Sequence, residues 1–114
     1  MQYALLIHNA PAESERPNDE ERQAISREYY ALRDDPRVVD GAALQPPQAA
    51  TTVRVQEGQT VLTDGPFANT KEVFGGWYVV DAADLDDAVE IVTRIPAVRF
   101  GGAVEVRPLM QGPH

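Results

Sequence analysis

Two segments with helical periodicity, each flanked by strand-like runs, constrain the fold of this chain most strongly. In the first, Ile25, Tyr29 and Leu32 recur at i, i+4 and i+7, and Asn18 or Asp19 can cap the start. This pattern predicts a helix over about 19–34, because the residue before Pro36 disfavours helical geometry. A second helix is expected from Asp84 to about residue 95, before Pro96. Each helix has one apolar face, which a sheet must cover.

The segments between the helices have the composition of strands. Strands are expected at 2–8, 37–44, 51–55, 60–63, 75–80 and 103–107. Gln2 to His8 is a continuous apolar run, which fits a central strand buried on both faces. Asp40-Gly41 is expected to bulge or bend the second strand, and Asn9 to Pro17 is expected to form a polar loop. Glu57-Gly58 predicts a hairpin, with glycine available for a positive φ.

The order strand, helix, strand, hairpin, strand, helix, strand predicts an α+β domain. Without the inserted β-hairpin, it is the ferredoxin-like split βαβ pattern. The length of 114 residues fits a single domain over residues 1–114. Both helices are expected on one face of the sheet, so the other face needs a cover. A second copy of the chain would provide one, and we therefore expect a homodimer.

Composition excludes several classes of function. Ten basic residues against 18 acidic ones give a net charge of −8, which disfavours direct binding to nucleic acid or to an anionic membrane. The chain has no cysteine, so disulfides, thiolate nucleophiles and cysteine-based metal sites are excluded. The apolar run Tyr3 to Ile7 is too short to span a membrane and has no basic lead-in. A cytoplasmic protein is expected.

The motifs for metals and common cofactors are missing. Four acids cluster near the second helix, at Asp81, Asp84, Asp86 and Asp87, but without the glycine and final glutamate of a calcium loop. Carboxylates at that position are better explained as caps of the helix N-terminus. The sequence also lacks a GxGxxG loop and a Gly-x-Ser-x-Gly nucleophile motif. We expect no metal and no cofactor. Gly75-Gly76 is expected to allow close packing or a bulge at a strand start.

The stretch from Asp64 to Trp77 is the best candidate site, and two interpretations of it stay open. Asp64-Gly65-Pro66 is a turn signature, so the stretch could be a rigid loop whose Phe67 plugs the core. Alternatively, Asp64 is a carboxylate at a pocket wall that transfers a proton. In that case Lys71 and Glu72 set the local field or bind a polar substrate.

An apolar pocket and a proton-transfer partner complete this functional interpretation. Phe67, Phe74 and Trp77 would supply the apolar walls that small-molecule sites have. His8, at the end of the first strand, would be the partner of Asp64, because histidine titrates near neutrality. A structural, hydrogen-bonded histidine is the alternative. His114 lies in the C-terminal tail, and two isolated histidines do not form a zinc site.

These residues also resemble a known family. Asp64-Gly65-Pro66-Phe67, Thr70-Lys71-Glu72 and Gly75-Gly76 resemble the signature of the DGPF family, which is grouped with the YCII-related (YciI-like) proteins. The likeness extends to Leu44-Gln45-Pro46-Pro47, Thr51-Thr52-Val53-Arg54, Asp84-Leu85-Asp86, Arg94-Ile95-Pro96 and Glu105-Val106-Arg107-Pro108. The resemblance implies a ferredoxin-like domain that dimerises into an α/β barrel.

The resemblance implies two kinds of function. The wider group is suspected of catalysis by a His–Asp pair, with the histidine on the first helix, and relatives include a dehydrochlorinating enzyme acting on a substituted hydroquinone. Here the segment Asp19 to Asp34 has no histidine. Asp64 corresponds loosely to the acid, and His8 is the nearest substitute for the histidine. Tyr29 and Tyr30 are poor replacements, because a phenol titrates near 10.

The sequence therefore supports two hypotheses. The first is a small-molecule enzyme or binder whose pocket lies beside the DGPF loop, with Asp64 and His8 as acid and base. The second is a non-enzymatic module that interacts with a sigma factor in transcription initiation, as fusions of DGPF relatives to sigma-70-like factors imply. The residues alone do not decide whether the protein is an enzyme, and they do not name a substrate.

Overall fold

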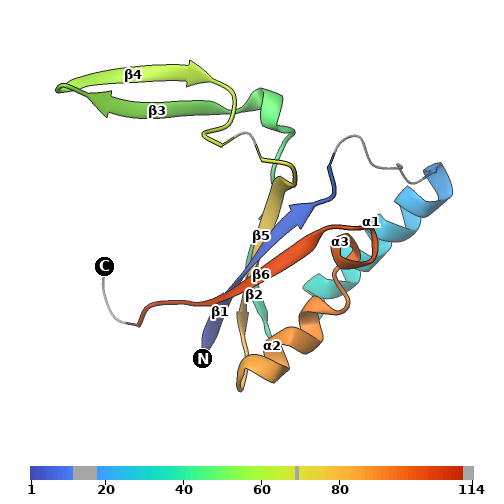
Figure 1. Ribbon diagram of the computed structural model, residues 1–114. Helices are drawn as coiled ribbons and strands as arrows, with labels where there is room; N and C mark the ends of the chain where they lie inside the picture. Colours follow the sequence, from blue (N-terminus) through green and yellow to red (C-terminus); the bar gives the residue numbers. More distant parts are fainter. Residues whose placement is uncertain (12–17, 69, 112–114) are drawn as a thin grey trace.

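The computed structural model describes residues 1–11, 18–68 and 70–111. Its centre is a four-stranded antiparallel sheet in the order β2-β5-β1-β6. The strands are β1 (Gln2–Asn9), β2 (Val38–Ala43), β5 (Val73–Asp81) and β6 (Ala103–Pro108). Three helices lie on one side of this sheet (Figure 1), namely α1 (Asp19–Arg33), α2 (Leu85–Val92) and α3 (Pro96–Arg99). This α+β arrangement is compatible with the predicted ferredoxin-like fold. Most of the loop predicted over residues 9–17 lies outside the described residues.

The core lies between the sheet and the helices. Tyr3, Leu5 and Ile7 of β1 are buried, while Ala4 and Leu6 between them are half-buried. The buried set is completed by side chains from the neighbouring elements, namely Leu32, Tyr78, Val80, Ala82, Ala88, Ile91, Ile95 and Ala97. β1 was predicted to be buried on both faces. Within this chain only its helix-facing side chains are fully buried, because no helix of the described residues covers the other face.

The ends of α1 match the predicted caps. The Asn18 side chain accepts a hydrogen bond from the backbone N–H of Glu21 at 2.8 Å. The Glu21 carboxylate in turn accepts from the Asn18 N–H at 3.2 Å. This reciprocal capping box fixes the start of the helix, as expected for an N-cap asparagine. The helix ends at Arg33, one residue before the predicted position.

The acids at the start of α2 are caps and ion-pair partners. The Asp84 carboxylate accepts from the Asp87 N–H at 2.9 Å, and Asp87 accepts from the Ala83 N–H at 2.9 Å. The capping interpretation is therefore confirmed for Asp84 and Asp87, whereas Asp81, at the end of β5, pairs with the N-terminal amine at 3.2 Å. The predicted helix end was wrong, because α2 stops at Val92 and Pro96 begins the short helix α3. Proline is well tolerated in the first turn of a helix, where its missing N–H is not needed.

Two glycines shape the side of the sheet formed by β2 and β5. The register with β1 shifts between Ile7, opposite Gly76, and His8, opposite Phe74, so Gly75 is the extra residue of a bulge. This confirms the bulge predicted at Gly75-Gly76. The irregularity of β2 falls at Val39, one residue before the predicted Asp40-Gly41. Gly41 lies against the ring of Tyr78, where an added Cβ would be 2.6 Å from Cδ1.

The chain between β2 and β5 forms a separate two-stranded sheet. β3 (Thr51–Gln56) pairs with β4 (Gln59–Asp64), and the turn residues Glu57 and Gly58 have φ values of 51° and 80°. These positive values are those that a type I′ turn requires. The 3₁₀ helix η1 (Pro47–Ala49) precedes the hairpin, which projects away from the four-stranded sheet (Figure 1). The radius of gyration is 16.1 Å, against about 13 Å for a compact domain of this length.

Candidate functional site

A cavity of about 880 Å³ lies where the β3–β4 hairpin meets the main sheet. Its walls come from the end of β1, the turn around η1, the DGPF loop and the start of β5. Among the predicted site residues, those that line it are His8, Phe67, Glu72 and Phe74. A cavity of this size with a mostly apolar lining and a few polar groups is typical of small-molecule sites.

His8 lies on the face of the sheet that no described helix covers. Its partners across the strands are Phe74 on β5 and Ala103 on β6. The imidazole and the Phe74 ring have centroids 5.4 Å apart, with 34° between their planes. His8 is half-buried and Phe74 is exposed, so the imidazole is accessible from the cavity. Without a hydrogen-bonding carboxylate among the described residues, His8 is positioned by aromatic contact and strand pairing.

The DGPF loop is held at the base of the hairpin by two hydrogen bonds. The Gly65 N–H donates to the Ala50 carbonyl at 2.7 Å, and the Thr52 hydroxyl donates to the Gly65 carbonyl at 2.8 Å. Gly65 has φ of 103°, a value that favours glycine. The Arg54 guanidinium lies 4.9 Å from the centre of the Phe67 ring. Phe67 is 74% exposed, so the interpretation that it plugs the core is wrong.

Two polar residues just before β5, Thr70 and Glu72, also line the cavity. Glu72 lines the cavity, and its backbone carbonyl accepts a hydrogen bond from the Thr70 hydroxyl at 2.6 Å. Lys71 is exposed and is not one of the lining residues. Glu72 is therefore the carboxylate that shares this cavity with His8.

Asp64 and Trp77, which were predicted as site residues, do not line this cavity. Asp64 is the last residue of β4, is exposed, and pairs with Thr51 across the hairpin. It is not one of the residues that line the cavity around His8, and no hydrogen bond joins the two side chains in the described part of the chain. Trp77 pairs with Leu6 of β1 and lines a second cavity. An acid–base pair of Asp64 and His8 stays a prediction.

Several lining residues were not predicted from the sequence as site residues. They include Leu44, Pro46 and Pro47 before the hairpin, and Ala103 at the start of β6. The consecutive prolines were the available signal, because proline fixes φ, and here Pro46 is extended while Pro47 begins η1. Ala103 gave no signal, since only strand pairing places it beside His8.

Two further properties follow from the described residues. No group of three or more histidine, cysteine or acidic side chains among them could hold a metal ion. None of the helices in the described ranges is long and apolar enough to cross a membrane.

These features define an α+β domain with one open sheet face, a projecting hairpin and a cavity at the base of that hairpin. The model of the YCII-related domain matches residues 1–112, and the chain belongs to that family. It is similar to the uncharacterized protein R00369 of Rhizobium meliloti (strain 1021). The two sequences are 35% identical over an alignment that covers 96% of this chain and 92% of the relative.

Proposed function

We propose that this YCII-related protein binds a small organic molecule in the cavity at the base of the hairpin and acts on it by acid–base chemistry. The observation that carries the proposal is one 880 Å³ cavity shared by His8, Glu72 and two phenylalanines. Phe67 and Phe74 offer apolar area to a ligand, while His8 and Glu72 offer groups that exchange protons. A largely apolar molecule with one or two polar groups, such as a phenol or a small carbonyl compound, suits this lining.

The acid of the reaction has two candidates. Glu72 is a candidate because it lines the same cavity as His8 and lies two residues before Phe74 in the sequence. Asp64 supports it by its place in the DGPF motif, although it does not line the cavity within one chain. A second copy of the chain could add residues to the walls of the cavity. The proposal therefore keeps Asp64 as a candidate acid–base partner of His8 and adds Glu72 as a second candidate.

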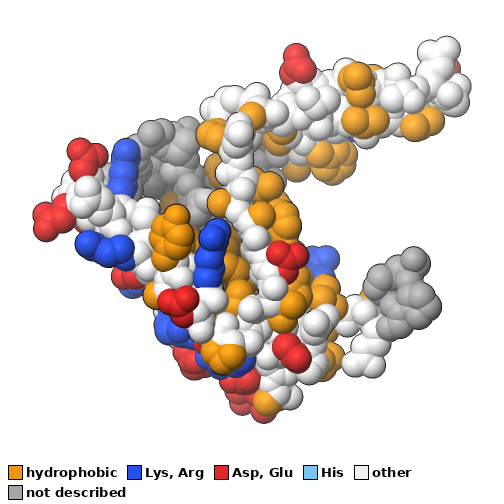
Figure 2. Space-filling view, turned by 180° about the vertical axis from the view of Figure 1, so that it is seen from behind, with side chains coloured by type: hydrophobic (Ala, Val, Ile, Leu, Met, Phe, Trp, Pro, Cys, Tyr) orange, Lys and Arg blue, Asp and Glu red, His pale blue; other side chains and the backbone are white. Residues whose placement is uncertain are grey.

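A homodimer is part of the proposal. The uncovered sheet face carries Leu6, Trp77 and Val79, which are only half-buried in the single chain. The hairpin exposes apolar side chains (Figure 2), and Val53, Val55 and Leu62 are 60%, 69% and 67% exposed. An isolated two-stranded hairpin is at best marginally stable in water, so contact with a partner would stabilise it. A second copy of the chain could cover both the sheet face and the hairpin, as in the barrel-forming dimers that the family resemblance implies.

Ligand-induced thermal stabilisation tests the proposal. A panel of phenolic and small carbonyl compounds is screened against the wild type, Glu72→Gln, Asp64→Asn and the control Glu57→Gln at the hairpin tip. A ligand at ten times its Kd adds about 1.4 kcal/mol, which corresponds to a shift of roughly 4–8 °C. The shift should persist in the control and fall in Glu72→Gln. A panel without any shift, or equal shifts in all four proteins, would contradict the proposal. Turnover that is identical in Asp64→Asn and wild type would remove Asp64 from the chemistry.

The cellular location and a role in transcription stay predictions. A cytoplasmic location and a role as a module associated with a sigma factor come from composition and family resemblance. Co-purification with an extracytoplasmic-type sigma factor at low salt would support the latter, because charge attraction is strongest there.

A further inference from the structure

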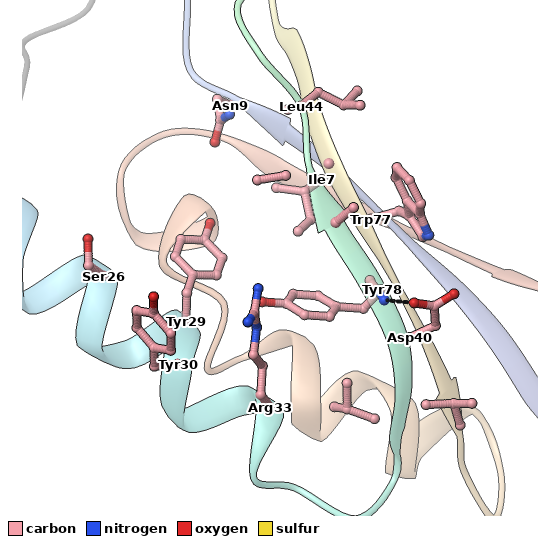
Figure 3. Close-up of a pocket in the computed structure, with 17 residues that line it drawn as sticks. Ile7, Asn9, Ser26, Tyr29, Tyr30, Arg33, Asp40, Leu44, Trp77 and Tyr78 are labelled. Atoms are coloured by element: carbon pink, nitrogen blue, oxygen red, sulfur yellow. Dashed lines mark hydrogen bonds between the residues drawn. The ribbon is translucent and has the colours of Figure 1, made fainter.

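A second cavity, of about 640 Å³, lies on the opposite side of the sheet, between α1 and the edge formed by β2 and β5. Figure 3 shows that Tyr29, Tyr30 and Arg33 reach into it from α1, while Tyr78 reaches toward them from β5. The cavity thus combines three phenol rings with one guanidinium. Neither the DGPF loop nor His8 contributes to its lining.

Arg33 is the cation of this cavity. It forms no salt bridge with any carboxylate of the described residues, and its guanidinium lies 5.4 Å from the centre of the Tyr30 ring. By contrast, Arg37 and Arg94 each contact two or more carboxylates. A guanidinium presents paired N–H donors that match a carboxylate, and this capacity is unused in Arg33 within the described chain.

The tyrosines supply aromatic surface and neutral donors. Burial raises the pKa of both Tyr29 and Tyr78, so their hydroxyls keep their protons at neutral pH. The Tyr78 ring packs against the backbone of Gly41, where an added Cβ would lie 2.6 Å from Cδ1 of the ring. A rigid aromatic ring near a guanidinium favours a ligand that is itself planar and anionic.

One carboxylate also lines the cavity, and its position matters for an anionic ligand. Asp40 lies with Trp77 on the far side of β2 from the tyrosines (Figure 3). Its Oδ1 accepts a hydrogen bond from the Gly41 N–H at 2.8 Å. The negative charge of Asp40 is therefore directed away from the α1 end of the cavity, where the positive charge of Arg33 can attract an anionic ligand.

We propose that this second cavity binds a small aromatic carboxylate, with the carboxylate on Arg33 and the ring among Tyr29, Tyr30 and Tyr78. Ser26 and Asn9 line the same cavity and can donate hydrogen bonds to further oxygens of such a ligand. Leu44 lines both cavities, but neither His8 nor Glu72 lines this one, so the proposal does not depend on them.

Benzoate is the probe for a calorimetric test. The wild type should bind it with a Kd on the order of 1 mM, as expected for a small fragment. Arg33→Gln should raise the Kd at least tenfold, because it removes the charged hydrogen bonds. Arg27→Gln, another exposed arginine on α1 that does not line the cavity, should leave the Kd within twofold. Tyr30→Leu should raise the Kd about threefold to tenfold through loss of the ring contact.

One control tests whether the carboxylate of benzoate is recognised, and a second locates the binding site in the protein. Benzyl alcohol, which keeps the ring without the charge, should bind at least tenfold more weakly than benzoate. Amide NMR shifts caused by benzoate should cluster at Ser26, Gly41 and Tyr78. Absence of benzoate binding, an unchanged Kd in Arg33→Gln, or shifts confined to Glu72 and Phe74 would each overturn the proposal. Glu72→Gln should bind benzoate normally, which separates this outcome from the test of the first cavity.

Discussion

Nη1 of Arg37 lies 2.5 Å from Oδ1 of Asp87, joining the segment before β2 to the first turn of α2, 50 residues further along the chain. The same guanidinium contacts Asp35 at 2.6 Å and Glu90 at 2.7 Å. Asp35 also contacts Arg94 at 2.6 Å. Because its side chain is only 9% exposed, Asp35 is the best-shielded carboxylate of this network. The network fixes the end of α1 against α2.

Replacement of Asp35 should destabilise the fold. Asp35→Asn keeps the shape of the side chain but removes the charge that two guanidinium groups share. We expect a loss of about 1–3 kcal/mol in the free energy of unfolding, as for a hydrogen bond to a charged group that is lost from a shielded site. Urea denaturation measures it. Asp34→Asn, an exposed neighbour, is the matched control and should change stability by less than about 0.5 kcal/mol. Equal stability of the two variants would contradict this account.

The same network predicts loss of stability in acid. The hydrogen bond from Arg37 holds the pKa of Asp35 well below its usual range and also lowers the pKa of Glu90. The pKa of Asp87 is lowered by the Ala83 N–H and by Arg37. A lowered folded pKa contributes stability above the unfolded value of about 4, and that stability is lost as the pH falls through the folded values. Denaturation midpoints should therefore drop steadily below about pH 4.5. In Asp35→Asn the drop should be shallower, and an equally steep curve would argue against Asp35 as a source.

Local signals in the sequence predicted the elements of this fold well. Asn18 with Glu21 marks the start of α1, and Glu57-Gly58 marks the hairpin turn, because caps and turns depend on residues close in sequence. Buried and less buried side chains alternate along β1 and β5, because helices cover only one face of the sheet. The errors lie where distant parts meet. α2 ends at Val92, and turn hydrogen bonds from the Arg94 and Ile95 N–H groups lead the chain into α3. The register shift at Val39 occurs where β2 pairs with β5.

The candidate site was only partly predictable, for the same reason. His8 and Phe74 are 66 residues apart in sequence, and only antiparallel pairing places them side by side. The motif suggested that Asp64 and Trp77 share one pocket with them. Strand pairing instead places Trp77 opposite Leu6, where it does not line the cavity of His8 and Phe74, and it pairs Asp64 with Thr51 in the hairpin. Arg33 was overlooked because a lone arginine near a helix end resembles a favourable dipole contact.

A methyl group at position 41 should disturb the tyrosine cavity. In Gly41→Ala the new Cβ would lie 2.6 Å from Cδ1 of Tyr78 and 2.8 Å from the Trp77 carbonyl oxygen. The ring must move, so we expect a destabilisation of about 1–3 kcal/mol, typical of overpacking. Thermal unfolding and near-ultraviolet circular dichroism should both change. Gln45→Ala, an exposed change nearby, should alter neither. An unchanged spectrum in Gly41→Ala would mean that the ring is not held in this position.

The hairpin should be part of the proposed dimer, and charge on its apolar side chains tests this. Val55 and Leu62 are 69% and 67% exposed in the single chain, so each could be replaced by aspartate without burying a charge inside it. If a second copy covers them, Leu62→Asp and Val55→Asp place a carboxylate in an apolar interface, which costs far more than the same change in water. Light scattering should then show a dimer for the wild type and monomers or weakened dimers for one or both variants. Thr63→Asp is the matched control for the loss of strand propensity, because Thr63 is exposed on β4 and its side chain points to the opposite face of the hairpin from Leu62. A wild type that stays monomeric at all concentrations would contradict the dimer. A dimer unaffected by either apolar replacement would place the interface on the open sheet face alone, around Leu6 and Trp77.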